Sequence, residues 1–271
     1  MKIANAPREP TTPISPWIFL WIVAVFAIIP VYFFNHEIFF WLNCRGMNEV
    51  LKNFFLLMTS LADGALIFSL VILVSLQFRK SLSAFVIAAI FSNVVLHSLK
   101  IIVSAKRPLA FFETGKVCVL GFPVTVNSFP SGHSLSAILL FMYLRNFTHG
   151  WTKISIFVFC LLAAISRAVV GAHFPIDILA GALMGVTIYW LVECYLADHF
   201  SKLQLSRAGV LFKVLVGVFA TVFFIFFYTE RNIQMDSVTL PLAVLLLSYF
   251  LFRGGVWIRT ISFHKNGEPH D

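Results

Sequence analysis

Long apolar runs separated by short polar segments dominate this chain. The first run, Pro16–Phe34, has 19 residues and no charge, and it follows a polar tail that carries Lys2 and Arg8. A helix needs about 20 apolar residues to cross a bilayer. The run is too long for the apolar part of a signal peptide, and no small-residue cleavage site follows it. We therefore predict a retained membrane helix.

The segment Asn48–Asp63 has a mixed pattern. Its apolar residues recur at helical spacing, with polar side chains between them: Val50, Phe54, Leu57, Met58 and Leu61. This pattern is typical of a helix that lies in the membrane interface. Asp63 is then placed to cap a second span that reaches Phe78.

Six further apolar runs follow: about Leu82–Val103, Ser131–Phe147, Ile154–Val170, Pro175–Ala197, Val210–Tyr228 and Val238–Phe252. The last has 15 residues and contains Pro241, so a short, tilted or re-entrant segment is as good an interpretation as a full span. We find no internal repeat and no soluble domain. The pattern predicts an all-α fold, a polytopic membrane helix bundle, with residues 1–271 forming a single integral membrane domain.

Composition agrees with a membrane protein. Hydrophobic residues make up 59% of the chain and charged residues 12%, about half the charged fraction of soluble domains. The net charge of +8 comes from cations between the apolar runs. Cations in such positions orient membrane segments and hold anionic substrates. We expect the lipid bilayer as surroundings and no nucleic-acid partner, and four cysteines without a CxxC pair indicate no zinc site.

The distribution of Lys and Arg predicts the orientation. If the N-terminus is cytoplasmic and all eight segments cross, 12 of these residues lie inside and 8 outside. Because positive residues are enriched in cytoplasmic loops, this bias favours a cytoplasmic N-terminus. Cys44 and Cys118 then share the outer side, where they can pair or remain free loop thiols.

Polar residues gather at three span ends on the outer side. The segments are Lys100–Pro108, Pro130–His133 and Ser166–Asp177. A single cation at a span end is usually a snorkelling anchor, and a single serine is often a helix cap. Three separate segments must supply this set together, however, and one topology places all of them on the same face. The set therefore indicates a functional site.

The residue types in these segments suit a phosphate group. Lys100, Arg107 and Arg167 are cations without a matching cluster of carboxylates, and the two arginines present planar forks that fit phosphate oxygens. Ser131 and Gly132 begin a helix after a proline, where free backbone N–H groups bind anions. We expect these five residues to hold the phosphate.

Two histidines and a carboxylate supply candidate chemistry. His173 precedes Asp177 by four residues, so the carboxylate can hold the imidazole in one tautomer and leave the other nitrogen as a nucleophile. His133 is placed to donate a proton to the leaving oxygen. We expect no cofactor and no metal, because the cations can stabilise the transferred phosphoryl group and Asp177 alone is too small a ligand set.

The three segments resemble the signature motifs of the type 2 phosphatidic acid phosphatase superfamily: K-x6-R-P, P-S-G-H and S-R-x5-H-x3-D. The resemblance covers roughly residues 50–197, a six-helix core, and leaves one or two extra hydrophobic helices at about 210–252 unexplained. It implies a metal-independent phosphatase with a phosphohistidine intermediate. In that mechanism His173 is the nucleophile, Asp177 supports it, and His133 protonates the leaving group and then activates water.

Several functions stay open at this stage. A membrane site that faces outward suits a lipid phosphate or pyrophosphate, such as undecaprenyl pyrophosphate, phosphatidylglycerol phosphate, phosphatidic acid or a lipid A phosphate. A lipid-to-lipid phosphotransferase would use the same residues. A lipid-phosphate transporter or a non-catalytic scaffold is disfavoured, because both histidines are present and no repeated halves are found. We expect a bacterial inner membrane location with the site facing the periplasm, and the sequence leaves the oligomeric state open.

Overall fold

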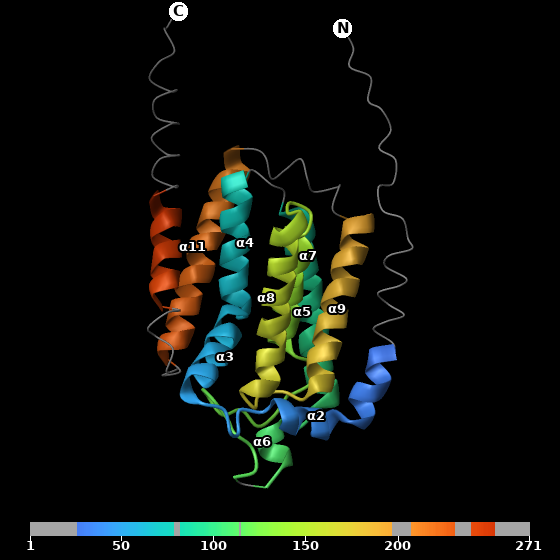
Figure 1. Ribbon diagram of the computed structural model, residues 1–271. Helices are drawn as coiled ribbons and strands as arrows, with labels where there is room; N and C mark the ends of the chain where they lie inside the picture. Colours follow the sequence, from blue (N-terminus) through green and yellow to red (C-terminus); the bar gives the residue numbers. More distant parts are fainter. Residues whose placement is uncertain (1–25, 79–81, 114, 197–206, 231–239, 253–271) are drawn as a thin grey trace, which may run out of the picture.

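The computed structural model describes residues 26–78, 82–113, 115–196, 207–230 and 240–252, and every regular element in these ranges is a helix (Figure 1). The principal helices are α2 (Asn35–Leu42), α3 (Glu49–Leu61), α4 (Gly64–Phe78), α5 (Ser83–Val103), α6 (Pro108–Phe111), α7 (Gly132–Leu144), α8 (Gly150–Val169), α9 (Pro175–Tyr195) and α11 (Arg207–Glu230). Residues 26–33 and Leu240–Phe252 are also helical. The all-α prediction is confirmed.

The longer helices run side by side, and the short helices α2, α3 and α6 gather at one end of the bundle (Figure 1). Helix α7 packs against α4, α5, α8 and α9 and so lies at the centre. Ser83–Phe111, Gly150–Val169 and Pro175–Tyr195 are long and apolar enough to cross a membrane. Helices α3 and α4 add a fourth candidate if they are taken as one span bent by 65°. The chain is an integral membrane protein.

The predicted helix boundary at Asp63 is confirmed, because α3 ends at Leu61 and α4 begins at Gly64. The side chain of Asn48 accepts the N–H of Leu51, which caps α3. Asp63 Oδ1 accepts the N–H of Ala65 at 2.9 Å and begins α4. A side-chain acceptor at this position satisfies a donor that the helix leaves unpaired. The chain therefore turns at Asp63 without an exposed break in the apolar region.

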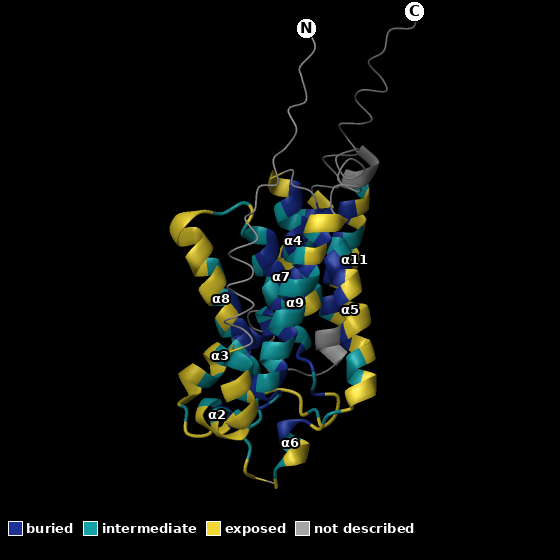
Figure 2. Cartoon of the chain, turned by 90° about the vertical axis from the view of Figure 1, so that its right-hand side faces the viewer, coloured by how far each residue is buried: buried dark blue, intermediate teal, exposed yellow. Residues whose placement is uncertain are grey.

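Close packing of α7 on α9 depends on small residues. A Cβ atom added at Gly181 would lie 2.3 Å from the carbonyl oxygen of Ser131. Only a glycine allows the start of α7 to approach α9 this closely. On α5 the large apolar side chains of Ile90, Phe91 and Val94 are exposed. Figure 2 shows exposed stretches on the outer helices of the bundle. These faces suit contact with lipid.

The N-terminal run differs from the prediction in its described part. Residues 26–33 are helical, the helix breaks at Phe34, and α2 follows as a separate element. Residues 16–25 of the predicted first span lie outside the described ranges. Neither α2 nor α6 was predicted, because both are too short for a periodic pattern to emerge.

The two extra C-terminal helices are present. Helix α11 packs on α4, and Thr221 Oγ1 donates to Ser69 Oγ at 3.1 Å. The eighth run forms the helix Leu240–Phe252. Pro241 lies in its first turn, where a missing N–H costs nothing, so the proline begins this helix and does not interrupt it.

Candidate active site

The beginning of α9 holds the predicted histidine–carboxylate pair. Asp177 is the third residue of α9, and its Oδ2 accepts the backbone N–H of Phe174 at 2.9 Å. His173 Nδ1 lies 3.5 Å from the same oxygen, and both side chains are buried. The turn before His173 is closed by its N–H, which donates to the carbonyl of Arg167 at 3.1 Å. The contact with Asp177 involves Nδ1 of the imidazole, so Nε2 is left for chemistry.

Ser128 is a site residue that sequence reasoning missed. Its hydroxyl donates to Asp177 Oδ2 at 2.5 Å and lies 3.5 Å from His173 Nδ1. Ser128 is fully buried in the loop before α7. The residue contacts a partner 49 positions away, and no local pattern in the sequence signals such a contact.

Two of the predicted phosphate-binding cations point into the same loop. Arg107 Nε donates to the carbonyl of Val126 at 2.9 Å, and its Nη1 donates to the carbonyl of Ala172 at 3.1 Å. Lys100 Nζ donates to the carbonyl of Asn127 at 3.0 Å. Arg107 therefore joins this loop to the turn before His173, and Lys100 contacts the same loop.

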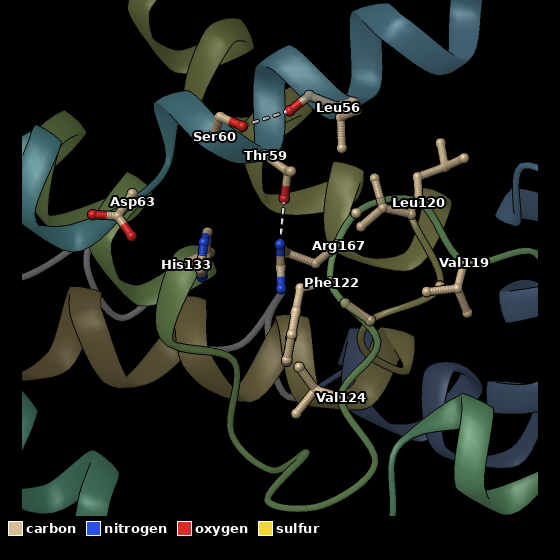
Figure 3. Close-up of a pocket in the computed structure, with 14 residues that line it drawn as sticks. Leu56, Thr59, Ser60, Asp63, Val119, Leu120, Phe122, Val124, His133 and Arg167 are labelled. Atoms are coloured by element: carbon tan, nitrogen blue, oxygen red, sulfur yellow. Dashed lines mark hydrogen bonds between the residues drawn. The ribbon is translucent and has the colours of Figure 1, made fainter. Parts of the chain in front are cut away.

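The third cation, Arg167, extends from α8 toward α3. Its Nη1 donates to the hydroxyl of Thr59, which is buried (Figure 3). Thr59 was also missed, because a single threonine on an amphipathic helix carries no distinguishing signal. The contact joins α3 directly to a site cation.

Ser131 and Gly132 begin α7, as predicted. Ser131 Oγ accepts the hydroxyl of Ser134 at 2.9 Å and the backbone N–H of Ser134 at 3.4 Å. The N–H of Ser131 donates to the carbonyl of Asp177 at 3.0 Å. Part of the expected anion-binding capacity is therefore already used to cap α7 and to join it to α9.

A cavity of about 100 Å³ opens at this end of the bundle (Figure 3). His133 and Arg167 line it together with Thr59, Asp63 and Ala172. Lys100, Arg107, His173 and Asp177 do not line it, although Ala172 directly precedes His173. The volume is several times what one water molecule needs, so the cavity can admit a small polar group.

Charged groups inside and outside the cavity act on His173. The pKa of His173 is lowered well below its ordinary value, mainly by burial and then by the charges of Arg107, Arg167, Lys100 and His133. All four groups therefore act on the same imidazole. A lowered pKa keeps His173 neutral, which is the form that can act as a nucleophile.

A disulfide braces the loop beside the site. Cys44 and Cys118 are joined, with 5.6 Å between their Cα atoms, so the pairing that the sequence left open is present. The Asn43 side chain donates to the carbonyl of Cys118 at 2.9 Å and accepts the N–H of the same residue at 2.9 Å. At Gly171, where φ is +77°, an added Cβ would lie 2.2 Å from the carbonyl oxygen of Cys118. The braced loop thus packs directly on the turn that leads to His173.

Comparisons with known proteins agree with this arrangement. The model of the PAP2 superfamily matches residues 81–200. A lipid A 1-phosphatase from Rhizobium johnstonii is 26% identical over 127 residues, which are 46% of this chain and 48% of that protein. The chain thus spans about half the length of this curated relative.

A solved structure resembles the fold as well. The crystal structure of Aquifex aeolicus LpxE is 28% identical and aligns with a TM-score of 0.55, covering 59% of this chain and 95% of that chain. The matched region 81–200 contains all three motifs that converge at the site. Over residues 81–200 the chain is therefore similar to proteins of the PAP2 superfamily.

Proposed function

We propose that this protein is a metal-independent phosphatase of membrane lipid phosphates that acts through a phosphohistidine intermediate. The observation that carries the proposal is the convergence of three chain segments on one buried imidazole. His173 has its Nδ1 beside Asp177 and Ser128, and its pKa responds to three cations and a second histidine.

In the first step the lone pair of His173 Nε2 attacks phosphorus. The bond from phosphorus to the lipid oxygen breaks, and His133 donates a proton to that oxygen. Asp177 stabilises the positive charge that develops on the imidazole, and Ser128 holds Asp177 through a hydrogen bond at 2.5 Å. The products of this step are the lipid alcohol and a phosphorylated His173.

In the second step His133 accepts a proton from water. The water oxygen attacks phosphorus, the bond from phosphorus to Nε2 breaks, and inorganic phosphate leaves. Charge on the equatorial oxygens is stabilised in both steps by Lys100, Arg107 and Arg167 and by the start of α7 at Ser131 and Gly132. Within the described ranges, no three His, Cys, Asp or Glu side chains are grouped to hold a metal ion.

A lipid phosphomonoester is the substrate class that fits best, and the 1-phosphate of a lipid A-type glycolipid is the first candidate. The support is the curated relative named as a lipid A 1-phosphatase. The apolar faces around the site would keep the acyl chains in the bilayer while the phosphate reaches Arg167 and His133. Undecaprenyl pyrophosphate, phosphatidylglycerol phosphate and phosphatidic acid are the comparison substrates.

Release of inorganic phosphate from these four lipids by the purified protein tests the proposal. We expect turnover in EDTA, inhibition by vanadate, and an acid-labile phosphoprotein that is lost in His173→Ala. Loss of turnover on chelation, with recovery on adding metal, would contradict the mechanism. A phosphorylated acceptor lipid formed in place of free phosphate would indicate a phosphotransferase.

We further propose that the site faces the periplasm. The bias of Lys and Arg supports this orientation, and so does the disulfide between Cys44 and Cys118, since disulfides persist in oxidising compartments. A Glu113→Cys variant tests it, because Glu113 is exposed and Cys194, at the other end of α9, is an exposed native control. An impermeant thiol reagent should label residue 113 in intact cells and Cys194 after lysis. The reverse order would invert the orientation.

A further inference from the structure

A second cavity, of about 430 Å³, lies between α4, α5, α7 and α11. Its walls are mainly aliphatic and aromatic side chains, among them Phe68, Ala89, Leu139, Phe219 and Ala220. We call it the apolar groove. It is about four times as large as the cavity at the candidate active site.

The few polar side chains in the apolar groove have partners within their own helices. Asn93 Nδ2 donates to the carbonyl of Ala89 at 2.8 Å. Ser136 Oγ donates to the carbonyl of Gly132 at 3.0 Å. Because these donors are satisfied, the apolar groove presents an apolar interior to any occupant.

The apolar groove adjoins the active-site cavity. Asp63 lines the active-site cavity, and the next residue, Gly64, lines the apolar groove. On α7, His133 lines the first and Ser136 the second, and residues three apart on a helix share a face. The two spaces therefore lie next to each other at the bend between α3 and α4.

The dimensions of the apolar groove match one leaflet. Its lining on α5 extends from Asn93 to Phe85, which is about 12 Å along a helix. Half of a hydrocarbon core is about 15 Å deep. Since Asn93 lies toward the end of α5 that carries Lys100, the apolar groove descends from the site into the bilayer.

We propose that the apolar groove holds one hydrocarbon chain of the lipid whose phosphate occupies the active site, and that α11 makes this protein selective for chain length. The proposal rests on the lipid phosphatase function proposed above. Helix α11 supplies Phe219, Ala220 and Phe223 to the apolar groove and lies outside the family match at 81–200. Selectivity of this kind therefore comes from a part of the chain that the family core lacks.

The wall that α11 forms is fixed from both sides. Toward α4, Lys213 Nζ donates to Ser75 Oγ at 3.0 Å, and Thr221 contacts Ser69. Polar contacts of this kind hold helices together in lipid. On the other side, a Cβ added at Gly217 would lie 2.8 Å from the ring of Phe250, so the last helix packs closely on α11.

Filling the apolar groove from either wall tests the proposal. Ala220→Phe and Ala89→Phe place a ring in it from α11 and from α5, and Val222→Phe adds similar bulk on an exposed face of α11 as the matched control. The measurement is kcat/KM in mixed micelles for one headgroup with graded acyl chains. A ring that fills the groove leaves less room for a long chain than for a short one, so the ratio of long-chain to short-chain kcat/KM should fall at least about fivefold in both groove variants. The ratio should be unchanged in Val222→Phe.

The possible outcomes separate the two proposals. If the wild-type protein releases phosphate from none of the lipids, the proposed function fails. If the wild type is active and both groove variants keep the wild-type ratio, the proposal for the apolar groove is overturned.

A second measurement uses the wild type and so does not depend on whether a variant folds. A lipid phosphate with a photoreactive group in mid-chain is irradiated with the protein, and the adducts are mapped. Adducts on the α11 peptide that contains Phe219 and Phe223 support the proposal. Adducts confined to other helices contradict it.

Discussion

Two cations at the active-site end, Lys100 and Arg107, are held differently from the polar side chains at the α4–α11 interface. At the active-site end, Lys100 and Arg107 donate to backbone carbonyls of the loop before α7 and of the turn before His173. At the α4–α11 interface, hydrogen bonds between the two helices join side chain to side chain, as in Lys213 with Ser75 and Thr221 with Ser69. Backbone contacts fix the position of a catalytic group relative to the fold, whereas side-chain contacts fix one helix against another.

Mutations in the two regions should have different consequences. A change at the active-site end should lower turnover of every substrate by a similar factor, because the same phosphoryl group is transferred each time. A change along α11 should alter the ranking of substrates and leave short-chain turnover intact. The ratio of long-chain to short-chain kcat/KM separates the two effects.

His173→Ala should have the largest effect. Removing the nucleophile should lower kcat by about 10⁴-fold or more, with membrane insertion and the amount of folded protein unchanged. The measurement is phosphate release by detergent-purified protein, with Val222→Phe as a control for expression. Full activity in a well-expressed His173→Ala protein would refute the proposed mechanism.

Asp177→Asn should lower kcat less than His173→Ala does. The amide keeps an acceptor for Ser128 and for the N–H of Phe174 but loses the charge that stabilises the imidazolium. We expect kcat to fall by about 10²–10⁴-fold, by the same factor for long and short chains. A loss that depended on chain length would mean that the two regions are not independent.

Ser128→Ala tests the residue that the sequence did not reveal. A hydrogen bond to a charged group contributes about 1.5–3 kcal/mol, so we expect kcat to fall about 10–100-fold while KM changes little. Ser128→Thr keeps the hydroxyl and should restore much of the rate. Equal loss in both variants would indicate that Ser128 acts through packing alone.

The smallest effect is a dependence of stability on pH. Because the pKa of His173 is lowered in the folded protein, the unfolded chain binds a proton below about pH 6.5 that the folded chain does not. Stability should therefore fall as pH decreases from 6.5 toward the lowered value, by up to about 1.4 kcal/mol per pH unit.

Melting midpoints in detergent at pH 7.5 and pH 5.5 measure this dependence. The wild type should lose more stability between them than His173→Ala, which lacks the group. Identical losses would show that His173 titrates normally in the folded state.

Prediction from sequence succeeded where a local signal exists. Apolar runs located the helices from α4 onward except the short α6. The position of Asp63 before an apolar run located a cap that the structure confirms at 2.9 Å. The histidine–carboxylate spacing likewise placed His173 beside Asp177. Each of these depends on residues within a few positions of one another.

Prediction failed where a contact depends on tertiary structure. Ser128 reaches Asp177 across 49 positions, and Thr59 reaches Arg167 across 108. The break at Phe34 separates two helical pieces that share one apolar run, so hydrophobicity alone could not locate it. The roles assigned to the site residues remain predictions for the experiments above.

The carbonyl contacts of the site cations have a consequence for binding equilibria. In the structure, Lys100 and Arg107 already donate hydrogen bonds to the backbone carbonyls of Val126, Asn127 and Ala172. A phosphate that takes these donors gains charge-assisted hydrogen bonds and releases carbonyl oxygens that must find new partners. Binding is thus an exchange of acceptors, so its net free energy is smaller than the sum of the new contacts. An anion that has only oxygen acceptors leaves the released carbonyls without a hydrogen-bond donor. A headgroup that also carries hydroxyl or amide donors can donate to them.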